Sequence, residues 1–409
     1  MKSTEKKHLI ILSTSIAPRK EPQAYILKKY LKQFSTYGYG KISVIGLDSP
    51  ERHLSVEDDV LDKIFEIVRI KEVAPVLLRM INIVTVRSIY RMPDQYILEF
   101  YKILKALKKV INNSNCESIT IMAFCQSFTM ALVGVFAKRM NRRIRLVVHF
   151  SDPWTNNLFG KKYTIVQRLN RLFEKFVISH SDALVFVNQE TRDLTMEKYD
   201  SEWYRKSVVI SHPIDFDLYP AVLALERKKF IIRYIGNFYV ERNPLSFFAA
   251  LVQLHARHPE LQEKFVFEMY GQPYREVKHW ITDAQLEGIA VYKGAVGYEE
   301  SLALMKSADL LLSIDADAEE NVFLPSKVVD YIGSLRPVLA ITPTKGATAT
   351  LLKRIGQHVF GHNDTNGIVR CIETLMAEKN NHGLVAGIEK KDIMDFDVKN
   401  LSGNYRELF

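Results

Sequence analysis

The stretch from Phe323 to Ala340 places a cation and a carboxylate at a spacing that suits a nucleotide. Lys327 and Asp330 are three residues apart, and Pro325 and Ser326 come just before them. If a helix opens here, Ser326 can cap it, and the N–H groups of its first turn form an anion site with Lys327. Asp330 then lies one turn later, where its carboxylate can accept the hydroxyls of a ribose. A solvated ion pair on an ordinary amphipathic helix is the alternative.

A second cation follows an expected strand over residues 230–235. The strand leads into Gly236 and Asn237, and Arg242 and Asn243 stand just before an expected helix. A glycine at the end of a strand lets the backbone approach a ligand closely, and an arginine near a helix start can reach a phosphate. The alternative is a surface arginine beside a turn.

The next two expected strands also end in glycine. Residues 265–270 lead into Gly271, and residues 290–292 lead into the loop that contains Gly294, Ala295 and Val296. The backbone of this loop can contact the edge of a base. These positions extend the candidate nucleotide site beyond the two cations.

The elements that must position these residues alternate along the chain. Short β-branched runs at 9–13, 42–45, 118–123, 145–150 and 183–187 alternate with amphipathic runs at 23–37, 96–111 and 128–140. A second series of strands is expected at 230–235, 265–270, 290–292, 310–314 and 338–341. This alternation is typical of parallel βαβ units, whose ligand loops lie at the carboxyl ends of the strands. We therefore expect two α/β domains, with a boundary near residues 211–225.

From Gly236 to Pro343, the order of these features resembles the donor half of GT-B glycosyltransferases. The closest pattern is that of bacterial retaining, family-four-like enzymes of the surface-polysaccharide type, which carry Pro-Ser-Lys, two apolar residues and Asp-Tyr. The resemblance implies two Rossmann-like domains facing a cleft. It implies an N-terminal acceptor-side domain at 1–213, a nucleotide-sugar-binding domain at 214–390 and a segment at 391–409 that returns to the first domain. A frayed tail is the alternative for this segment.

The resemblance also implies roles for the residues named above. Arg242 and Lys327 stabilise the leaving diphosphate, and Asp330 holds the ribose of the donor. The other donor-site positions are Gly236, Asn237, Asn243, Gly271, Gly294, Ala295, Val296, Pro325 and Ser326. The usual acidic residue eight positions before Asp330 is replaced by Val322, with Glu319 and Glu320 out of register.

In the first half, a buried strand at 145–150 opens into Ser151, Asp152 and Trp154. Similar transferases carry Asp-Pro-Trp here, which implies an acceptor and sugar pocket with Asp152 as a candidate base. Packing of Trp154 beneath an Asp-Pro turn is the alternative. Arg19, in the loop after the first strand, either meets an acceptor phosphate or is solvated.

No metal site is expected, because the resemblance implies that two cations replace the metal and a nucleotide sugar is the co-substrate. Two acidic triplets, at 315–317 and 215–217, are the alternative, since metal-dependent transferases use such pairs. Cys116, Cys125 and Cys371 have no metal-ligand or disulfide spacing. The first residues lack a signal-peptide pattern, so a cytoplasmic protein is expected.

Charge is unevenly distributed along the chain. Residues 1–213 hold 34 Lys and Arg against 21 Asp and Glu, a net charge of +13, whereas residues 214–409 hold 22 against 26, a net charge of −4. This asymmetry favours an anionic partner for the first half, either a membrane surface or a phosphorylated acceptor. The apolar and lysine-rich helix at 96–111 suggests peripheral binding to a membrane that holds a lipid-linked acceptor, helped by Arg79, Arg87 and Arg91. A core-facing helix with a solvated basic face is the alternative. No nucleic-acid-binding motif accompanies the basic residues.

Beyond a glycosyltransferase with a glycan or lipid-linked acceptor, two functions stay open: a GT-B nucleotide-sugar epimerase and a non-catalytic subunit that binds a sugar nucleotide or glycan. The residue at position 322 motivates the second of these. The sequence does not specify the sugar, the base, the acceptor or the linkage.

Overall fold

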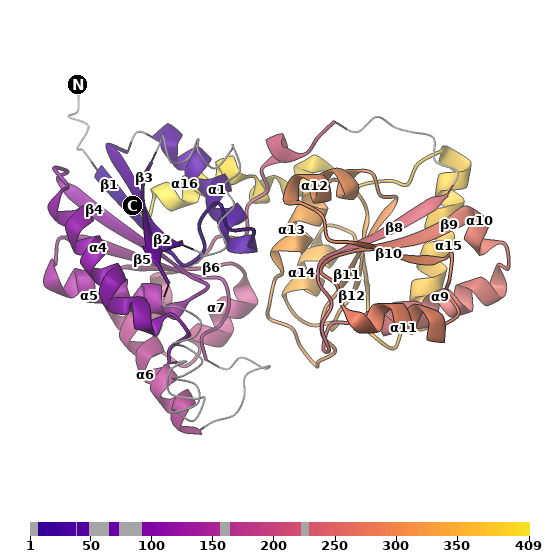
Figure 1. Ribbon diagram of the computed structural model, residues 1–409, viewed down its shortest axis with the longest axis horizontal. Coiled ribbons are helices and arrows are strands. Elements are labelled where there is room, and N and C mark those ends of the chain that lie inside the picture. Colours follow the sequence, from indigo (N-terminus) through magenta and orange to yellow (C-terminus); the bar gives the residue numbers. More distant parts are fainter. Residues whose placement is uncertain (1–6, 38, 49–64, 73–91, 156–163, 222–228) are drawn as a thin grey trace. The chain divides into compact units, whose positions relative to one another are not determined.

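The computed structural model describes residues 7–37, 39–48, 65–72, 92–155, 164–221 and 229–409. The chain divides into two compact units, the first made of Met1–Pro213 with Val398–Phe409 and the second of Ile214–Asp397. Each unit is built on one parallel sheet with helices on both faces (Figure 1). The α/β class is therefore confirmed. The chain re-enters the first unit at Val398 rather than at residue 391.

The first unit contains a seven-stranded sheet in the order β3-β2-β1-β4-β5-β6-β7. The described strands all pair in parallel, and the order reverses direction between β1 and β4. In sheets of this kind, ligands bind beyond the carboxyl ends of the strands at such a reversal. The strands are β1 (Lys7–Ser13), β2 (Lys41–Asp48), β3 (Glu66–Lys71), β4 (Ser118–Cys125), β5 (Ile144–Phe150), β6 (Ala183–Phe186) and β7 (Ser207–Val209).

Helices cover both faces of this sheet, which explains why its central strands are continuous apolar runs. One core lies under α4, α5 and α6, and the other lies under α1 and α16 (Figure 1). Tyr405 of α16 packs against Tyr30 of α1, with ring centroids 5.0 Å apart. The helices are α1 (Pro22–Phe34), η1 (Ser35–Tyr37), η2 (Ile97–Glu99), α4 (Phe100–Asn112), α5 (Phe128–Met140), α6 (Thr164–His180), α7 (Gln189–Met196), α8 (Ser201–Arg205) and α16 (Val398–Arg406).

The second unit contains a six-stranded sheet in the order β10-β9-β8-β11-β12-β13. Its strands are also parallel, and the order reverses between β8 and β11. The loops after these two strands are therefore the expected place for a ligand. The strands are β8 (Phe230–Ile235), β9 (Phe265–Tyr270), β10 (Ala290–Gly294), β11 (Leu310–Ile314), β12 (Val338–Ile341) and β13 (His358–Phe360).

Helices also enclose the second sheet. Helices α9, α10, α11 and α15 pack on one core, whereas α12, α13, α14 and η4 pack on the other. Their bounds are η3 (Phe216–Leu218), α9 (Leu245–Arg257), α10 (Leu261–Lys264), α11 (Arg275–Asp283), α12 (Tyr298–Lys306), α13 (Ser326–Gly333), α14 (Ala347–Arg354), α15 (Thr365–His382) and η4 (Lys390–Phe396).

The uncharged stretch at 118–137 forms a strand and a helix, β4 and α5, as the sequence predicted. Within the residues that the structure describes, no helix combines the length and apolar character needed to cross a bilayer. The amphipathic helix α4 faces the core: Ile103, Leu104, Leu107 and Val110 are buried, and Ile97, Phe100 and Ile111 pack against the same cluster. The apolar stripe of α4 is therefore not available to a membrane, and the core-facing alternative holds.

Candidate functional site

The carboxyl ends of β8, β9 and β10 are joined by backbone contacts, and the close approach at Gly271 leaves no room for a side chain. The Gly236 N–H donates to the Tyr270 carbonyl at 2.8 Å, and the Gly271 N–H donates to the Gly294 carbonyl at 3.0 Å. A Cβ on Gly271 would lie 2.2 Å from the Gly236 oxygen, so a side chain there would force the loops apart. The Asn237 Oδ1 accepts from the Gln272 N–H at 2.8 Å. These residues, predicted separately, are thus brought to one edge of the sheet.

Arg242 lies on a tight turn of the loop between β8 and α9. The backbones of Tyr239 and Arg242 exchange hydrogen bonds of 3.0 and 2.9 Å, and the guanidinium lies 5.0 Å from the centroid of the Tyr239 ring. The Arg242 Nη2 atom is 3.6 Å from Oδ1 of Asp315, which follows β11. Its Nε atom is buried and has no hydrogen-bond partner. The loop therefore holds a donor that lacks an acceptor.

Lys327 comes from the first turn of α13. Its Nζ lies 4.2 Å from the centroid of the Tyr234 ring, is buried and has no hydrogen-bond partner. Desolvation lowers the pKa of this ammonium well below 10.5, the positive charge of Arg242 lowers it further, and the negative charge of Asp315 opposes the shift. The sequence predicted that Ser326 caps this helix. Instead, the helix begins at Ser326, its N-cap residue is Pro325, and no side chain caps it.

Asp330 lies one turn after Lys327 on α13 and is 8% exposed. The Tyr298 hydroxyl donates to its Oδ1 at 3.1 Å, and the Tyr219 hydroxyl donates to its carbonyl at 2.8 Å. Two tyrosines from other elements therefore fix the position of this carboxylate.

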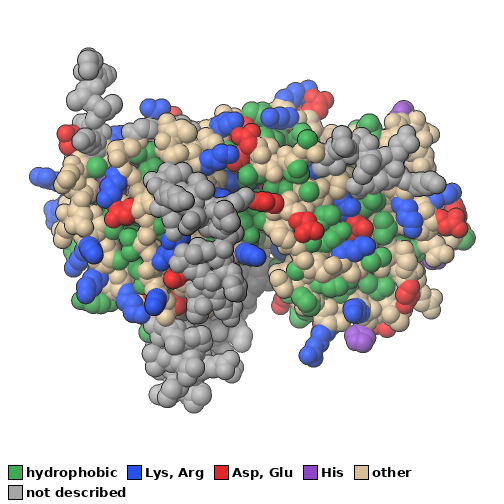
Figure 2. Space-filling view, turned by 45° about the horizontal axis from the view of Figure 1, so that its top comes forward, with side chains coloured by type: hydrophobic (Ala, Val, Ile, Leu, Met, Phe, Trp, Pro, Cys, Tyr) green, Lys and Arg blue, Asp and Glu red, His purple; other side chains and the backbone are tan. Residues whose placement is uncertain are grey.

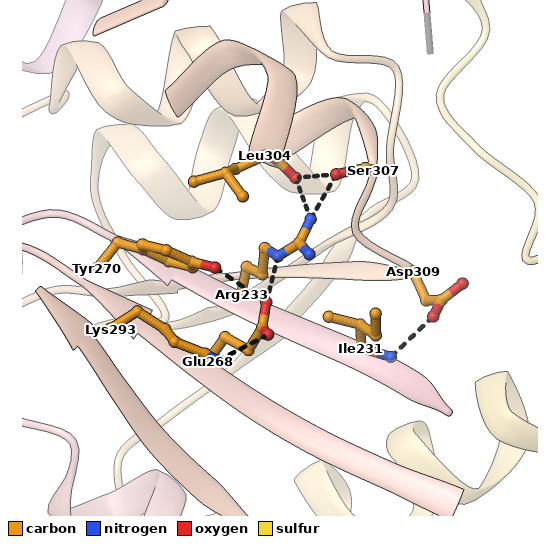
Figure 3. A network of polar contacts seen from close by, with 8 residues as sticks. All are labelled: Ile231, Arg233, Glu268, Tyr270, Lys293, Leu304, Ser307 and Asp309. Atoms are coloured by element: carbon orange, nitrogen blue, oxygen red, sulfur yellow. Dashed lines mark hydrogen bonds and ion pairs between the residues drawn. The ribbon is translucent and has the colours of Figure 1, made fainter. Parts of the chain in front are cut away.

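Tyr298 is the first residue of α12, and buried Arg233 holds the other end of that helix. Arg233 donates to the Leu304 carbonyl and to the Ser307 hydroxyl, each at 2.6 Å, and to Glu268 Oε2 at 2.7 Å (Figure 3). These contacts join the end of α12 to strands β8 and β9. The network thereby supports the placement of Tyr298 and, through it, of Asp330.

The remaining donor-side residues have more ordinary surroundings. The Asn243 side chain donates to the Val240 carbonyl at 2.9 Å and accepts from the Leu245 N–H at 3.2 Å, so it shapes the loop before α9. Ala295 is exposed, and Val296 packs against the core near α12. Of the predicted donor residues, these three are the least closely tied to the cations.

The candidate residues of the first unit fall into two groups. Ser151 and Asp152 follow β5, and the Ser151 hydroxyl lies 3.5 Å from Gln23 Oε1. The Asp152 side chain reaches the surface, yet desolvation by the surrounding protein raises the pKa of its carboxyl to about 6.

Trp154 and Arg19 are engaged with other residues. The Trp154 ring stacks on Phe128, with centroids 4.3 Å apart, and is 7% exposed. This arrangement favours packing beneath the turn over a place in a pocket. The Arg19 guanidinium pairs with Glu72 and with Glu21, which is 3.8 Å away, so its charge is largely compensated.

Comparisons with known proteins agree with this architecture. Residues 62–218 match the model of Glycosyltransferase Family 4. Sucrose-phosphate synthase from Thermosynechococcus elongatus superposes with a TM-score of 0.68 at 10% identity, over 98% of both chains. Anabaena HepE, solved with UDP-glucose, gives 0.67 at 13% identity over 98% of both chains. The N-terminal domain of trehalose-6-phosphate phosphatase from Candida albicans gives 0.68 at 12% identity, over 98% of this chain and 96% of that one. A search of curated proteins finds no match.

The chain therefore has the GT-B fold of these structures, and part of its first half matches a glycosyltransferase family model. The position of the missing acidic residue is buried: Val322 is 5% exposed, and the neighbouring Asn321 carbonyl accepts from the Ala347 N–H at 2.8 Å. Glu319 and Glu320 are exposed.

Sequence reasoning missed two residues that lie beside the predicted ones in the candidate site. Tyr298 was visible only as the start of a helix, and its contact with Asp330 depends on how α12 and α13 pack. Asp315 was considered only as half of an acidic triplet that might hold a metal. Its place after β11, beside the order reversal of the sheet, was the signal that marked it as a site residue.

Proposed function

We propose that this protein is a glycosyltransferase that moves a sugar from a nucleotide-diphosphate sugar to a glycan or lipid-linked acceptor, with retention of configuration, in surface-polysaccharide synthesis. One observation carries the donor assignment: Lys327 Nζ and Arg242 Nε are buried donors without acceptors, in the loops where this fold places a ligand. Unsatisfied buried donors are costly, and charged ones especially so. An anion with several acceptor oxygens, such as a diphosphate, satisfies both.

In this proposal, Arg242 and Lys327 stabilise the charge that develops on the leaving diphosphate. Such preorganised charge is usually the largest single contribution to catalysis. Asp330, positioned by Tyr298, accepts the ribose hydroxyls, and the glycine-linked loops after β8, β9 and β10 contact the rest of the nucleotide. Asp152 is the candidate base toward the acceptor hydroxyl, since a carboxyl with a pKa of about 6 is suited to proton transfer near neutral pH. Anabaena HepE, which has a similar fold, was solved with UDP-glucose.

The direct test is a thermal-shift panel of UDP-, GDP-, CMP- and dTDP-sugars, followed by turnover with candidate acceptors. A ligand present at 100 times its dissociation constant adds about 2.7 kcal/mol of stability, which is readily measured. Nuclear magnetic resonance of the first-formed product then reports its anomeric configuration. Binding of a nucleotide sugar without its consumption would favour the non-catalytic alternative, and interconversion of sugars without transfer would favour an epimerase.

We also propose that the enzyme works at the cytoplasmic face of a membrane, through a surface other than the buried stripe of α4. Four large apolar side chains project from the outer helices of the first unit: Tyr101, Phe136, Met140 and Leu172, which are 74%, 43%, 52% and 62% exposed. Phe136 of α5 contacts Phe100 of α4, with ring centroids 5.2 Å apart, and Phe176 of α6, with ring centroids 6.1 Å apart. These contacts place the three helices side by side.

Exposed cations lie on the same three helices and in the turn after α5: Lys105, Lys108, Arg139, Arg142, Arg143, Arg168, Arg171 and Lys175. Lys and Arg side chains are visible along the left-hand margin of the molecule in Figure 2, over the first unit. Arg79, Arg87 and Arg91 lie outside the described residues. Apolar side chains among cations suit the interface of an anionic bilayer, where each basic residue contributes about 1 kcal/mol.

Co-sedimentation with phosphatidylglycerol and phosphatidylcholine vesicles at low and high salt tests the membrane proposal. We expect binding to the anionic vesicles alone, released by salt, and weakened several-fold by Met140→Ser with Leu172→Ser. Val252→Ser, which removes a 43% exposed side chain from the second unit, is the matched control. Equal binding to both kinds of vesicle, or binding to neither, contradicts this part of the proposal.

A further inference from the structure

Asp315 is a fully buried carboxylate that interacts with both cations of the donor site. Its exposed fraction is 0%, and it follows β11 at the order reversal of the second sheet. The Thr342 hydroxyl donates to its Oδ2 at 2.9 Å, and its backbone N–H donates to the Ile341 carbonyl at 2.9 Å. Its Oδ1 has no hydrogen-bond partner and faces the Arg242 Nη2 atom at 3.6 Å. The carboxylate is thus held rigidly from β12 and directed toward the cations.

A buried acid beside an anion site is unexpected from simple electrostatics, since its charge repels a diphosphate. Its neighbours indicate a reason for its presence. Lys327 and Arg242 are like charges that share one water-poor site, and each has a polar atom without a partner. Two such cations without a counter-charge favour loss of a proton from the stronger acid, which is the ammonium of the lysine.

We propose that Asp315 is a positioning residue that keeps Lys327 protonated and directs Arg242 toward the donor diphosphate. The inference rests on the proposed donor site and names a third charged residue in it. The groups facing Lys327 are Arg242 from the loop after β8, Asp315 from the loop after β11 and the Tyr234 ring from β8. Burial raises the pKa of Tyr234, so this phenol stays neutral.

The proposal and simple repulsion predict opposite effects of Asp315→Asn on the affinity for a diphosphate. If Asp315 only repels the ligand, Asp315→Asn tightens diphosphate binding at every pH. If Asp315 sustains the charge on Lys327, the variant loses affinity as pH rises, because Lys327 then deprotonates at a lower pH. Asparagine has nearly the same shape and can still accept from Thr342, so the fold is preserved.

The experiment measures the affinity of UDP and of inorganic pyrophosphate by calorimetry from about pH 6 to pH 9. We expect the pH at which binding weakens to fall by about one unit or more in Asp315→Asn. Above that pH, affinity should decrease about tenfold per pH unit, because one proton is linked to binding. The double variant Asp315→Asn with Lys327→Met should lose this pH dependence. Asp317→Asn makes the same charge change at an exposed position two residues away, and should behave like the unsubstituted protein.

Parallel pH profiles for the unsubstituted protein and Asp315→Asn, or uniformly tighter binding, would overturn the role of Asp315. If neither probe binds the unsubstituted protein, the donor-site proposal fails, and Asp315 is judged by thermal unfolding instead. Because the pKa of folded Lys327 lies below that of the unfolded lysine, stability rises with pH between the two values. That rise should begin at a lower pH in Asp315→Asn and be absent in Lys327→Met. Coincident unfolding profiles would contradict the proposal without reference to any ligand.

Discussion

The two sheets end in loops of opposite electrostatic character. At the edge of the second sheet, Arg242 and Lys327 share one carboxylate, Asp315, which lies 3.6 Å from Arg242 Nη2, although that half of the sequence has a net charge of −4. In the first unit, the cation after β1, Arg19, is compensated by Glu72 and Glu21, although that half carries +13. Net charge therefore indicates only which unit is basic. The position of an anion site depends on which cations the fold leaves incompletely compensated by carboxylates.

The positive charge of the first unit is therefore available to a partner other than the donor diphosphate. Many of its exposed cations lie on or beside the outer helices α4, α5 and α6, whereas half-buried Lys198 is paired with Glu174 at 2.6 Å. A phosphorylated acceptor is thus less well supported by Arg19 than the sequence suggested. The pairing of Arg19 agrees better with an uncharged acceptor at the loops of the first unit. The exposed cations of α4, α5 and α6 agree better with an anionic surface at those helices.

The largest effect is expected from removing the unpartnered cations. Lys327→Met and Arg242→Ala should each reduce turnover by roughly 10² to 10³, the loss expected for one preorganised charge stabiliser. Both cations lie deeper than the sequence suggested, because the Arg242 side chain is 18% exposed and Lys327 Nζ is buried. Lys327→Met should therefore raise the melting temperature while it reduces activity, since it removes a desolvated charge. Steady-state kinetics and thermal unfolding check both effects, and unchanged rates in both variants would end the donor-site assignment.

Acidification should lower the stability of the first unit, because its sheet holds a buried neutral histidine. Burial lowers the pKa of His149 to about 3, and His212 contributes in the same direction. The unfolded chain therefore binds the proton first, and stability is complete above about pH 6.5 and falls as the pH drops toward 3. Each pH unit in this window costs about 1.4 kcal/mol for one such group.

His149→Phe should flatten this acid dependence, because the ring is enclosed by Phe124 and Tyr405 and phenylalanine preserves the aromatic contacts. Part of the dependence should remain, since burial also lowers the pKa of His8 to about 4. Urea unfolding followed by circular dichroism between pH 4 and 7 measures the effect. An acid profile unchanged by the substitution would show that His149 is not the group responsible.

A smaller effect on activity is expected from the compensated cation of the first unit. Arg19→Ala should change turnover less than about threefold, while it lowers the free energy of unfolding by roughly 1–2 kcal/mol because Glu72 loses its partner. Lys20→Ala, at the exposed neighbouring position, is the control and should change neither quantity. A loss of activity comparable to that of Arg242→Ala would remove the contrast between the two sheets.

The smallest effect is expected from removing divalent metal. If Arg242 and Lys327 supply the positive charge at the diphosphate, dialysis against EDTA should leave turnover within about twofold. Asp315 then acts on these cations and not on a metal. Loss of activity with EDTA and its recovery with Mg²⁺ or Mn²⁺ would favour the acidic-triplet alternative instead.

The sequence predicted the central strands well, because a strand buried on both faces is a continuous apolar run that is easily recognised. The expected strands at 265–270, 310–314 and 338–341 agree with β9, β11 and β12 at both ends. Three edge strands, β3, β7 and β13, were not predicted. Two of them are only three residues long, and an edge strand is covered less completely, so its pattern is weak.

The order of the elements and the motif at Lys327 and Asp330 were properties of the sequence alone, because they depend on local periodicity and on spacing along the chain. Tertiary packing decided whether each site residue is paired, how deeply it is buried and in which direction its pKa is shifted. Arg19 and Lys327 were both predicted to meet a ligand, yet the folded chain brings Glu72 to the first and leaves the Nζ of the second without a hydrogen-bond partner. Likewise, only the folded chain stacks Trp154 on Phe128. It also brings Asp315 to Arg242, because β8 and β11 are neighbours in the sheet although they are distant in the sequence. Pairing, burial and pKa depend on neighbours distant in sequence, and the packing of the fold determines those neighbours.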